Sequence, residues 1–391
     1  MDLDQIQQTL RDYKLDGWLF FDHHRRDPLA YRILGISNEV EPTRRWYYFI
    51  PFTGEPRKLV HCIEGHSLDG LPGFRDIYSS WVDQQSKLQK MLAGSARVAM
   101  QYSPRCAIPY VSMVDAGTIE LVRDAGVEIV SSADLVQLFE AKWTKDQFEM
   151  HLEAGKLVDA VRRDAFRFVS DHFRGGSPVG EYDVQQFIRK RFSDSGLVTH
   201  HGPIVAVNAN ASDPHYEPNA ERSSPIQAGD LLLIDLWAKL PKSNAVYYDI
   251  TWTGFCGDGS IPDVIRNVFR VVVDARKKAS DFVIDRAANA VRVAGYEVDD
   301  VARGHIRSQG FGEFFFHRTG HSIGTEVHGT GANMDNLESH DDRQIIPNTC
   351  FSIEPGIYLP EFGIRSEVNI FAGDGWAKVT GEEQQELVRI W

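Results

Sequence analysis

The sequence has little cysteine, no excess of positive charge and no long apolar run. Its four cysteines lack Cys-x-x-Cys spacing and are too few for a disulfide framework. The net charge of −13 argues against nucleic acid or an anionic membrane as the main partner. No apolar run approaches the ~20 residues that span a bilayer, and the N-terminus is acidic and polar, unlike a secretory signal. We therefore expect a cytoplasmic protein that binds neither nucleic acid nor membrane.

Composition and length indicate a globular protein of two domains. Hydrophobic residues make up 42% of the chain and charged residues 25%, the ordinary balance of a soluble protein. A chain of 391 residues is long enough for two hydrophobic cores. An amphipathic helix over Asp4–Tyr13, a buried strand over Trp18–Phe21 and further alternating segments predict an α/β domain over residues 1–142.

A second domain is predicted to begin with a long helix. Thr144 and Gln147 form a capping-box pattern, and the apolar stripe that follows ends at Gly175–Pro178. Paired helices, also predicted near residues 181–193 and 262–290, combine with antiparallel strands, which favours an α+β domain over residues 143–391. The strands are predicted over residues 231–237, 246–253, 351–353 and 364–371.

Two aspartates lie where apolar strands would bury them. Asp235 directly follows the apolar run Leu231–Ile234, and Asp249 lies inside the strand-like run Tyr247–Trp252. Turn-forming residues at Pro241–Asn244 predict a hairpin that places the two carboxylates side by side. A buried carboxylate is costly unless a partner or a cation neutralises it.

Two glutamates repeat this pattern near the C-terminus. Glu354 follows another apolar strand-like run, and Glu367 lies within the run Ile364–Ile370. Strand alternation places Arg365, Glu367 and Asn369 on one face of that predicted strand. A polar face within a core-like strand needs a polar or cationic group to contact.

Four carboxylates in strand interiors would repel one another and take up protons unless cations neutralise them. With one imidazole they form a mixed oxygen and nitrogen ligand set that suits two divalent ions of the manganese, iron, cobalt or zinc type. Such a pair can activate a water and polarise a carbonyl. His321 is the imidazole candidate, and His328 follows seven residues later. The alternative is that each acid is an ion-pair partner and each histidine a surface residue.

Ordered motifs in the second domain resemble those of the "pita-bread" metallopeptidases, the family of methionine aminopeptidase, Xaa-Pro aminopeptidase and prolidase. The resemblance covers about residues 143–391, and the first 140 residues resemble the N-terminal domain of the creatinase and prolidase branch. It implies an α+β pita-bread catalytic domain with a smaller α/β domain before it. The motifs are Asn210–Tyr216, Gly229–Asp235, Tyr248–Thr251, Thr319–His328, Ser352–Tyr358 and Gly363–Glu367.

The resemblance implies a site for two divalent metal ions. Manganese is the favoured ion, with cobalt, zinc or iron as alternatives. Asp249 and Glu367 would bridge both ions, Asp235 would complete one, and His321 with Glu354 the other. Glu354 would also carry protons between a metal-bridging hydroxide and the leaving nitrogen, as a catalytic base and then acid.

The resemblance also implies residues that contact the substrate. His215 and His328 match catalytic histidines that face the scissile bond and stabilise the oxyanion. Arg365 matches an arginine beside the bridging glutamate that holds carboxylates in place, and His317 matches a histidine that either supports the metal ligands or lines the pocket wall. Tyr358 is a further candidate for the pocket, and packing is the alternative for both His317 and Tyr358.

The implied activity is hydrolysis of the peptide bond before proline in a di- or oligopeptide. Xaa-Pro dipeptidase (prolidase) is favoured, with Xaa-Pro aminopeptidase on longer peptides as the alternative. A metal hydrolase or lyase of a non-peptide small molecule and a metal-free binding protein are further alternatives on the same fold. The resemblance also implies a homodimer.

Two departures from the family concern the substrate pocket. The hairpin connection over Leu236–Tyr248 is longer than usual, so we expect it to extend toward the pocket. After His328, the segment Gly329–Gly331 stands where many prolidases have an arginine, which leaves open how a dipeptide carboxylate is held. Arg343 is a substitute candidate, although a solvated surface position is favoured for it.

Overall fold

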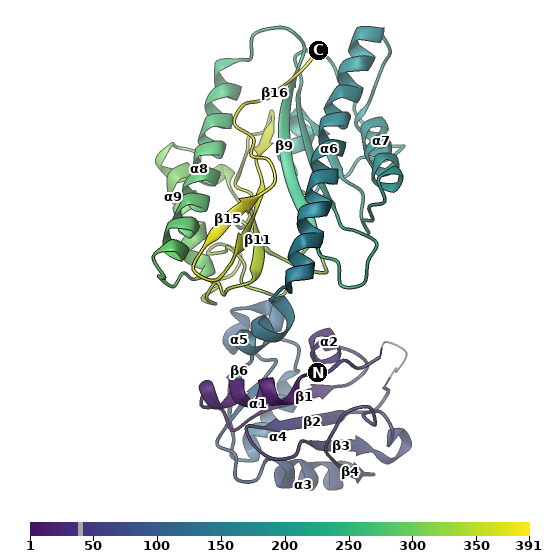
Figure 1. Cartoon of the computed structure of the whole chain (residues 1–391), viewed down its shortest axis with the longest axis vertical. Helices are drawn as coiled ribbons and strands as arrows, with labels where there is room; N and C mark the ends of the chain where they lie inside the picture. The colour runs from purple at the N-terminus through teal and green to yellow at the C-terminus, as the bar shows by residue number, and fades with distance from the viewer. Residues whose placement is uncertain (38–41) are drawn as a thin grey trace. The chain divides into compact units, whose positions relative to one another are not determined.

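The computed structural model describes residues 1–37 and 42–391 of the chain (Figure 1). Two units separate between Glu140 and Ala141, and each has its own hydrophobic core. The division lies two residues before the boundary expected from the sequence. Within the described residues, no helix is both long and apolar enough to cross a bilayer.

The first unit is built on a mixed sheet of six strands. In sheet order, the strands are β4 (Phe74–Tyr78), β3 (Arg57–His61), β2 (Trp46–Pro51), β1 (Gly17–Asp22), β5 (Arg97–Met100) and β6 (Glu128–Ser131). Strand β2 is antiparallel to both of its neighbours, whereas the other pairings are parallel. The carboxyl ends of all strands except β2 therefore lie at one edge of the sheet.

Short helices precede, connect and follow these strands. They are α1 (Leu3–Asp12), α2 (Pro28–Leu34), α3 (Trp81–Leu92), α4 (Ala116–Asp124) and α5 (Ala133–Val136). The helix predicted over Asp4–Tyr13 is confirmed as α1, which begins where the Asp2 side chain accepts a hydrogen bond from the Gln5 N–H and buries Ile6 and Leu10.

The second unit contains two four-stranded sheets and a two-stranded ribbon. One sheet has the order β16 (Val388–Ile390), β9 (Tyr248–Cys256), β8 (Leu231–Ala238) and β7 (Ile204–Val207). The other has the order β10 (Ser322–Ile323), β11 (Thr349–Ile353), β14 (Val368–Ala372) and β15 (Ala377–Thr380). The ribbon pairs β12 (Gly356–Tyr358) with β13 (Gly363–Arg365).

Two pairs of helices enclose these sheets (Figure 1). They are α6 (Lys145–Gly175) with α7 (Glu181–Asp194), and α8 (Asp263–Ala288) with α9 (Gly295–Ser308). Helix α6 packs on β8, β9 and β16, whereas α8 packs on β11, β13, β14 and β15. Each helix pair thus buries one apolar core against one group of strands, and the polar residues between the two groups are left to form a site.

Two local predictions for the second unit need correction. The single strand predicted over Ile364–Phe371 is divided, because Ser366 and Glu367 leave the ladder between β13 and β14. Helix α9 was not predicted, because Gly295 and Gly304 weaken its helical signal. Tertiary packing compensates for the low helix propensity, since α9 buries apolar side chains in the core that it shares with α8.

Helix α6 begins and packs as its sequence indicates. The predicted capping box is confirmed, because the Gln147 N–H donates to Thr144 Oγ1 at 3.2 Å and the Thr144 N–H donates to Gln147 Oε1 at 2.9 Å. Further along, Gly155 lies against the buried ring of Tyr248, the residue before Asp249. A Cβ at Gly155 would lie 2.8 Å from two ring carbons.

We predict that Gly155→Ala destabilises the protein by about 1–3 kcal/mol, because the Tyr248 ring is also confined by Gly381 and cannot move away. Gly304→Ala is the matched control, since no atom lies near its added Cβ and alanine stabilises an exposed helix by about 0.5–1 kcal/mol. Denaturant unfolding measures both changes. Equal effects of the two substitutions would contradict this packing.

Candidate metal centre

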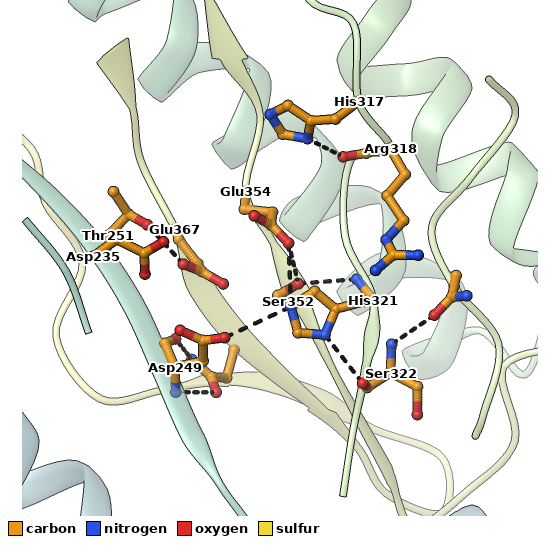
Figure 2. A network of polar contacts seen from close by, with 12 residues as sticks. Asp235, Asp249, Thr251, His317, Arg318, His321, Ser322, Ser352, Glu354 and Glu367 are labelled. Carbon is orange, nitrogen blue, oxygen red and sulfur yellow. Dashed lines mark hydrogen bonds and ion pairs between the residues drawn. The ribbon is translucent and has the colours of Figure 1, made fainter. Parts of the chain in front are cut away.

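Four carboxylates and one imidazole converge between the two sheets of the second unit (Figure 2). Asp235 and Asp249 lie on β8 and β9, and His321 directly precedes β10. Glu354 directly follows β11, and Glu367 lies in the break between β13 and β14. Four of the five side chains are buried and Glu354 is partly buried. Residues from five separate segments thus meet at one point.

The hairpin predicted for the two aspartates is confirmed. In the antiparallel ladder of β8 and β9, Asp235 lies opposite Thr251, and Asp249 lies opposite Trp237. Residues opposite each other, and residues two apart along a strand, share one face of a sheet. The two carboxylates therefore lie diagonally on the same face.

His321 presents a free ring nitrogen to the acids. Its Nε2 lies 3.6 Å from an oxygen of Asp249 and 3.3 Å from one of Glu354. Burial lowers the pKa of His321 to about 3, so the ring is neutral, and its Nδ1–H donates to the Ser322 carbonyl at 3.1 Å. That tautomer leaves the lone pair of Nε2 available for a metal ion. One ligand atom each from Asp249, His321 and Glu367 lie within 4.8 Å of one another.

A glycine and a serine bring His321 to β11. A Cβ at Gly320 would lie 1.9 Å from the Ser352 carbonyl oxygen, so only glycine permits this approach. The Ser352 hydroxyl accepts a hydrogen bond from the His321 N–H at 2.9 Å and donates to Glu354 Oε1 at 3.0 Å. Ser352 therefore fixes the imidazole and the glutamate relative to each other.

Burial makes the charged forms of the acids costly. It raises the pKa of Asp249 and that of Glu367 well above their ordinary values, and the neighbouring acids raise both further. Burial also raises the pKa of Asp235 and that of Glu354, an effect that the Arg365 guanidinium partly offsets. Without cations, this cluster holds protons that isolated carboxylates would release.

Three buried carboxylate oxygens in the cluster have no hydrogen-bond donor among the described residues: Asp235 Oδ1, Asp249 Oδ1 and Glu367 Oε1. An unpaired buried acceptor is destabilising in a structural ion-pair network. Anionic oxygens that share a cavity with an unprotonated imidazole nitrogen are the donor set of divalent manganese, iron, cobalt and zinc. The residues present therefore fit metal ions.

Arg365 is a cation built into this cluster. It donates to Asp235 Oδ2 at 2.6 Å, to Thr251 Oγ1 at 3.1 Å and to the Tyr358 hydroxyl at 2.9 Å. The Tyr358 hydroxyl in turn lies 2.7 Å from His317 Nε2, and burial lowers the pKa of His317 to about 3. Tyr358 and His317 thus orient Arg365, and their predicted contact with substrate stays a prediction.

Two further residues, Thr251 and Asn369, hold acids of the cluster through hydrogen bonds that were not predicted. The Thr251 hydroxyl donates to Glu367 Oε2 at 2.8 Å, and Asn369 hydrogen-bonds both backbone groups of Asp249, accepting from its N–H at 3.1 Å and donating to its carbonyl. Thr251 could have been found, since it lies two residues after Asp249 on the same strand face. Glu367 and Asn369 both contact β9, in line with the predicted polar face, although the strand is interrupted at Glu367.

Of the two histidines expected to face the substrate, His328 lies beside the cluster. The His328 ring stands edge-on to His321 with centroids 4.3 Å apart, and His328 is exposed. The adjacent His321 and the partial loss of water around the His328 ring lower the pKa of His328 to about 2, and Arg318 and His215 contribute smaller effects of the same sign. His215 is exposed as well. The neutral ring of His328 can donate a hydrogen bond.

The expectation that Arg343 lies in solvent is wrong. Its side chain is buried and pairs with Asp341 through two nitrogens, at 2.9 and 2.6 Å. The third nitrogen donates to the Thr330 carbonyl at 2.8 Å. Arg343 therefore holds the loop after His328 in place, and its charge is already neutralised.

The long hairpin connection after β8 packs against the chain that leads to His328. Lys239 Nζ donates to the Thr325 carbonyl at 2.5 Å, and the Tyr247 N–H donates to the Gly324 carbonyl at 2.9 Å. The register also places Trp237 on the same strand face as Asp235. The hairpin thus contacts the loop that leads to His328, and its expected extension toward the pocket stays a prediction.

Comparison with known proteins places the chain among peptidases. Residues 149–374 match metallopeptidase family M24. The uncharacterized peptidase YqhT of Bacillus subtilis is 27% identical over 273 residues, which cover 67% of this chain and 68% of that protein. The Xaa-Pro dipeptidase of Lactobacillus delbrueckii subsp. lactis is 28% identical over 252 residues, which cover 63% of this chain and 60% of that protein.

Solved structures agree on the fold. Dipeptidase PepE of Mycobacterium ulcerans superposes with a TM-score of 0.71 at 22% identity, over 99% of this chain and 96% of that one. The prolidase of Pyrococcus horikoshii OT3 gives a TM-score of 0.62 at 21% identity, over 99% of both chains. The predicted pita-bread fold with an α/β N-terminal domain is confirmed. Because the family match spans more than half of its residues, the chain belongs to metallopeptidase family M24.

Proposed function

We propose that this chain is an Xaa-Pro dipeptidase that works with two divalent metal ions, of which manganese is the favoured one. The observation that carries the proposal is the set of buried carboxylate oxygens without donors beside the free Nε2 of an imidazole. The substrate class is supported by the Xaa-Pro dipeptidases among the relatives. The ligands are Asp235, Asp249, His321, Glu354 and Glu367.

The charges of the acids support a division of the ligands between two ions. Burial raises the pKa values of Asp249 and Glu367, and the charges of Asp235 and Glu354 raise them further, so each of these two acids lies close to both of the others. We therefore assign the bridging positions to Asp249 and Glu367. When bound, the two ions supply Lewis acidity that lowers the pKa of a water and polarises the scissile carbonyl.

The side chains around this centre would handle the protons and the developing charge. Glu354 is raised in pKa and held at one oxygen by the Ser352 hydroxyl, so its carboxyl group can take a proton from water and deliver it to the leaving proline nitrogen. The rings of His215 and His328 would donate hydrogen bonds to the tetrahedral oxyanion. Arg365 would keep Asp235 charged and oriented.

A dipeptidase must also hold the free carboxylate of the proline. Arg343 and Arg365 are committed to Asp341 and Asp235. The charge of Arg318 reaches the site, because it lowers the pKa of His321, His328 and Glu354, and its side chain extends beside His321 (Figure 2). We assign the carboxylate to Arg318.

The metal-free binding protein is the weaker alternative, since every predicted ligand position carries a group able to bind a cation. A non-peptide substrate would use the same metal centre with a different pocket. Xaa-Pro aminopeptidase activity differs from the proposal in one respect, because a longer peptide presents no carboxylate at the proline.

We predict that Asp249→Asn removes the paired metal site. Manganese content should fall from two equivalents to one or fewer, and kcat/KM for Ala-Pro by on the order of a thousandfold, because a neutral amide is a poor bridging ligand. Asp258→Asn, at an exposed aspartate, should change neither value. Elemental analysis and an assay of proline release check both. Retention of two ions and full activity by Asp249→Asn would refute the assignment.

Manganese binding should release protons at pH 7. The raised pKa values of Asp235, Asp249, Glu354 and Glu367 mean that the metal-free cluster retains protons, which cations displace. We expect about one proton or more per chain, and weaker binding as the pH falls. Titration calorimetry in two buffers of different ionisation enthalpy measures the number. A value of zero would show that the acids are already ionised.

Arg318→Gln should distinguish the dipeptidase from its alternatives. KM for Ala-Pro should rise by about tenfold or more, whereas KM for the amide Ala-Pro-NH₂, which lacks the carboxylate, should change little. Ala-Pro-Ala should be a poor substrate of the unaltered protein. Equal losses on Ala-Pro and its amide would exclude Arg318 as the carboxylate ligand, and activity confined to Ala-Pro-Ala would favour an aminopeptidase.

A further inference from the structure

The first unit contains a cavity of about 650 Å³ to which the proposed activity assigns no role. Phe21, His61 and Tyr78 place the ends of β1, β3 and β4 in its wall, and the first turns of α3 and α4 complete it. These strands run in the same direction, so their carboxyl ends meet at one edge of the sheet. Crevices outside the carboxyl ends of strands are where α/β sheets usually bind ligands.

The wall of this cavity is rich in positive charge, although the chain as a whole carries −13. Arg26, Arg44 and Arg45 line it, and Asp115 is the one acid among the described lining residues. The Asp115 carboxylate accepts hydrogen bonds from the N–H and the hydroxyl of Thr118 at 3.0 and 2.9 Å. It is therefore committed to the start of α4.

The guanidinium groups in this wall have few protein partners. Those of Arg26 and Arg45 make no hydrogen bond or ion pair within residues 1–37 and 42–391, and Arg44 donates only to the carbonyl and hydroxyl of Thr43 there. The acid that interacts with Arg44 is Glu64. Its carboxylate accepts hydrogen bonds from the N–H groups of Thr43 and Arg44 and from the Thr43 hydroxyl. Among the described residues, Arg26 and Arg45 thus have no acidic partner, whereas Glu64 balances part of the charge of Arg44.

Two other lining residues add to this character. The Nδ1 of His61 accepts from the Ile63 N–H at 3.1 Å, so its Nε2 carries the proton and acts as a donor. Burial is the main cause that lowers the pKa of His23, and the charges of His24, Arg26 and Arg45 lower it further. These charge effects indicate a positive potential at the wall. Trp81, 67% exposed, presents an aromatic face at the rim.

A second arginine-lined cavity, beside α6 and β16, lacks this availability. It measures about 370 Å³ and includes Arg162, Arg163 and Arg167. Arg162 and Arg163 both pair with Glu382, and Arg167 pairs with a neighbouring aspartate. Acids of the protein already neutralise most of that charge, so the cavity of the first unit is the stronger anion site.

We propose that the cavity of the first unit binds a small phosphorylated molecule, with Arg26, Arg44 and Arg45 holding its phosphate and Trp81 contacting its organic part. Three guanidinium forks match the charge and geometry of a phosphate group. The volume lies in the range of small-molecule pockets. This inference is independent of the peptidase activity, since every lining residue belongs to the first unit.

Pyrophosphate is the probe, titrated calorimetrically into the full chain without added metal. We expect one binding event, weakened about tenfold or more by Arg45→Gln and by Arg26→Gln, since each removes a charge-assisted contact. Arg105→Gln is the matched control. It alters an exposed arginine of the same unit outside the cavity, and it should change the affinity by less than about twofold.

Further variants locate the bound anion. Trp81→Phe should remove a fluorescence change that pyrophosphate causes, while the heat of binding remains. Binding that survives Arg45→Gln but is lost in Arg167→Gln or in Asp249→Asn would place the anion in the second cavity or at the metal centre, and would overturn the proposal. So would the absence of binding at about 1 mM pyrophosphate, which means that the affinity is too weak for a built site.

Discussion

The strands of the second unit bring four carboxylates into one buried space. Their mutual repulsion is the constraint from which the metal-binding function of this unit follows. Burial alone raises the pKa of each acid, and the nearby acids add to the effect for Asp249 and Glu367. Arg365 lies within the cluster and donates to one oxygen of Asp235 at 2.6 Å, and the charge of Arg318 acts on Glu354 as well. The remaining charge must be carried by protons or by metal ions. The fold thus stores an electrostatic cost that divalent cations relieve.

The scaffold around the acids keeps them from separating. Gly320 lets the chain approach β11 closely, and Ser352 then holds both His321 and Glu354. Helices α6 and α8 pack against the two sheets from opposite sides (Figure 1). Apolar burial by the helix pairs therefore supplies the stability that the polar centre lacks. Function and stability are divided between different layers of the same unit.

Local patterns predicted the parts of the site that are local in sequence. The apolar run before Asp235 and the turn after it predicted the hairpin, and the Thr144 capping box predicted the start of α6. The partners of Arg365 could not be predicted in this way, because Asp235 lies 130 positions away and only the packing of two sheets joins them. The burial of Arg343 was missed for a similar reason. Arg343 pairs with Asp341, and only the tertiary fold buries this ion pair.

Manganese-soaked crystals, examined by anomalous scattering at the manganese edge, test the central claim most directly. The account predicts two peaks about 3.5–4 Å apart, with Asp249 and Glu367 between them and His321 Nε2 as a ligand of one. A single peak bound elsewhere, or acids that keep ion pairs and hydrogen bonds to protein groups in the presence of manganese, would contradict it.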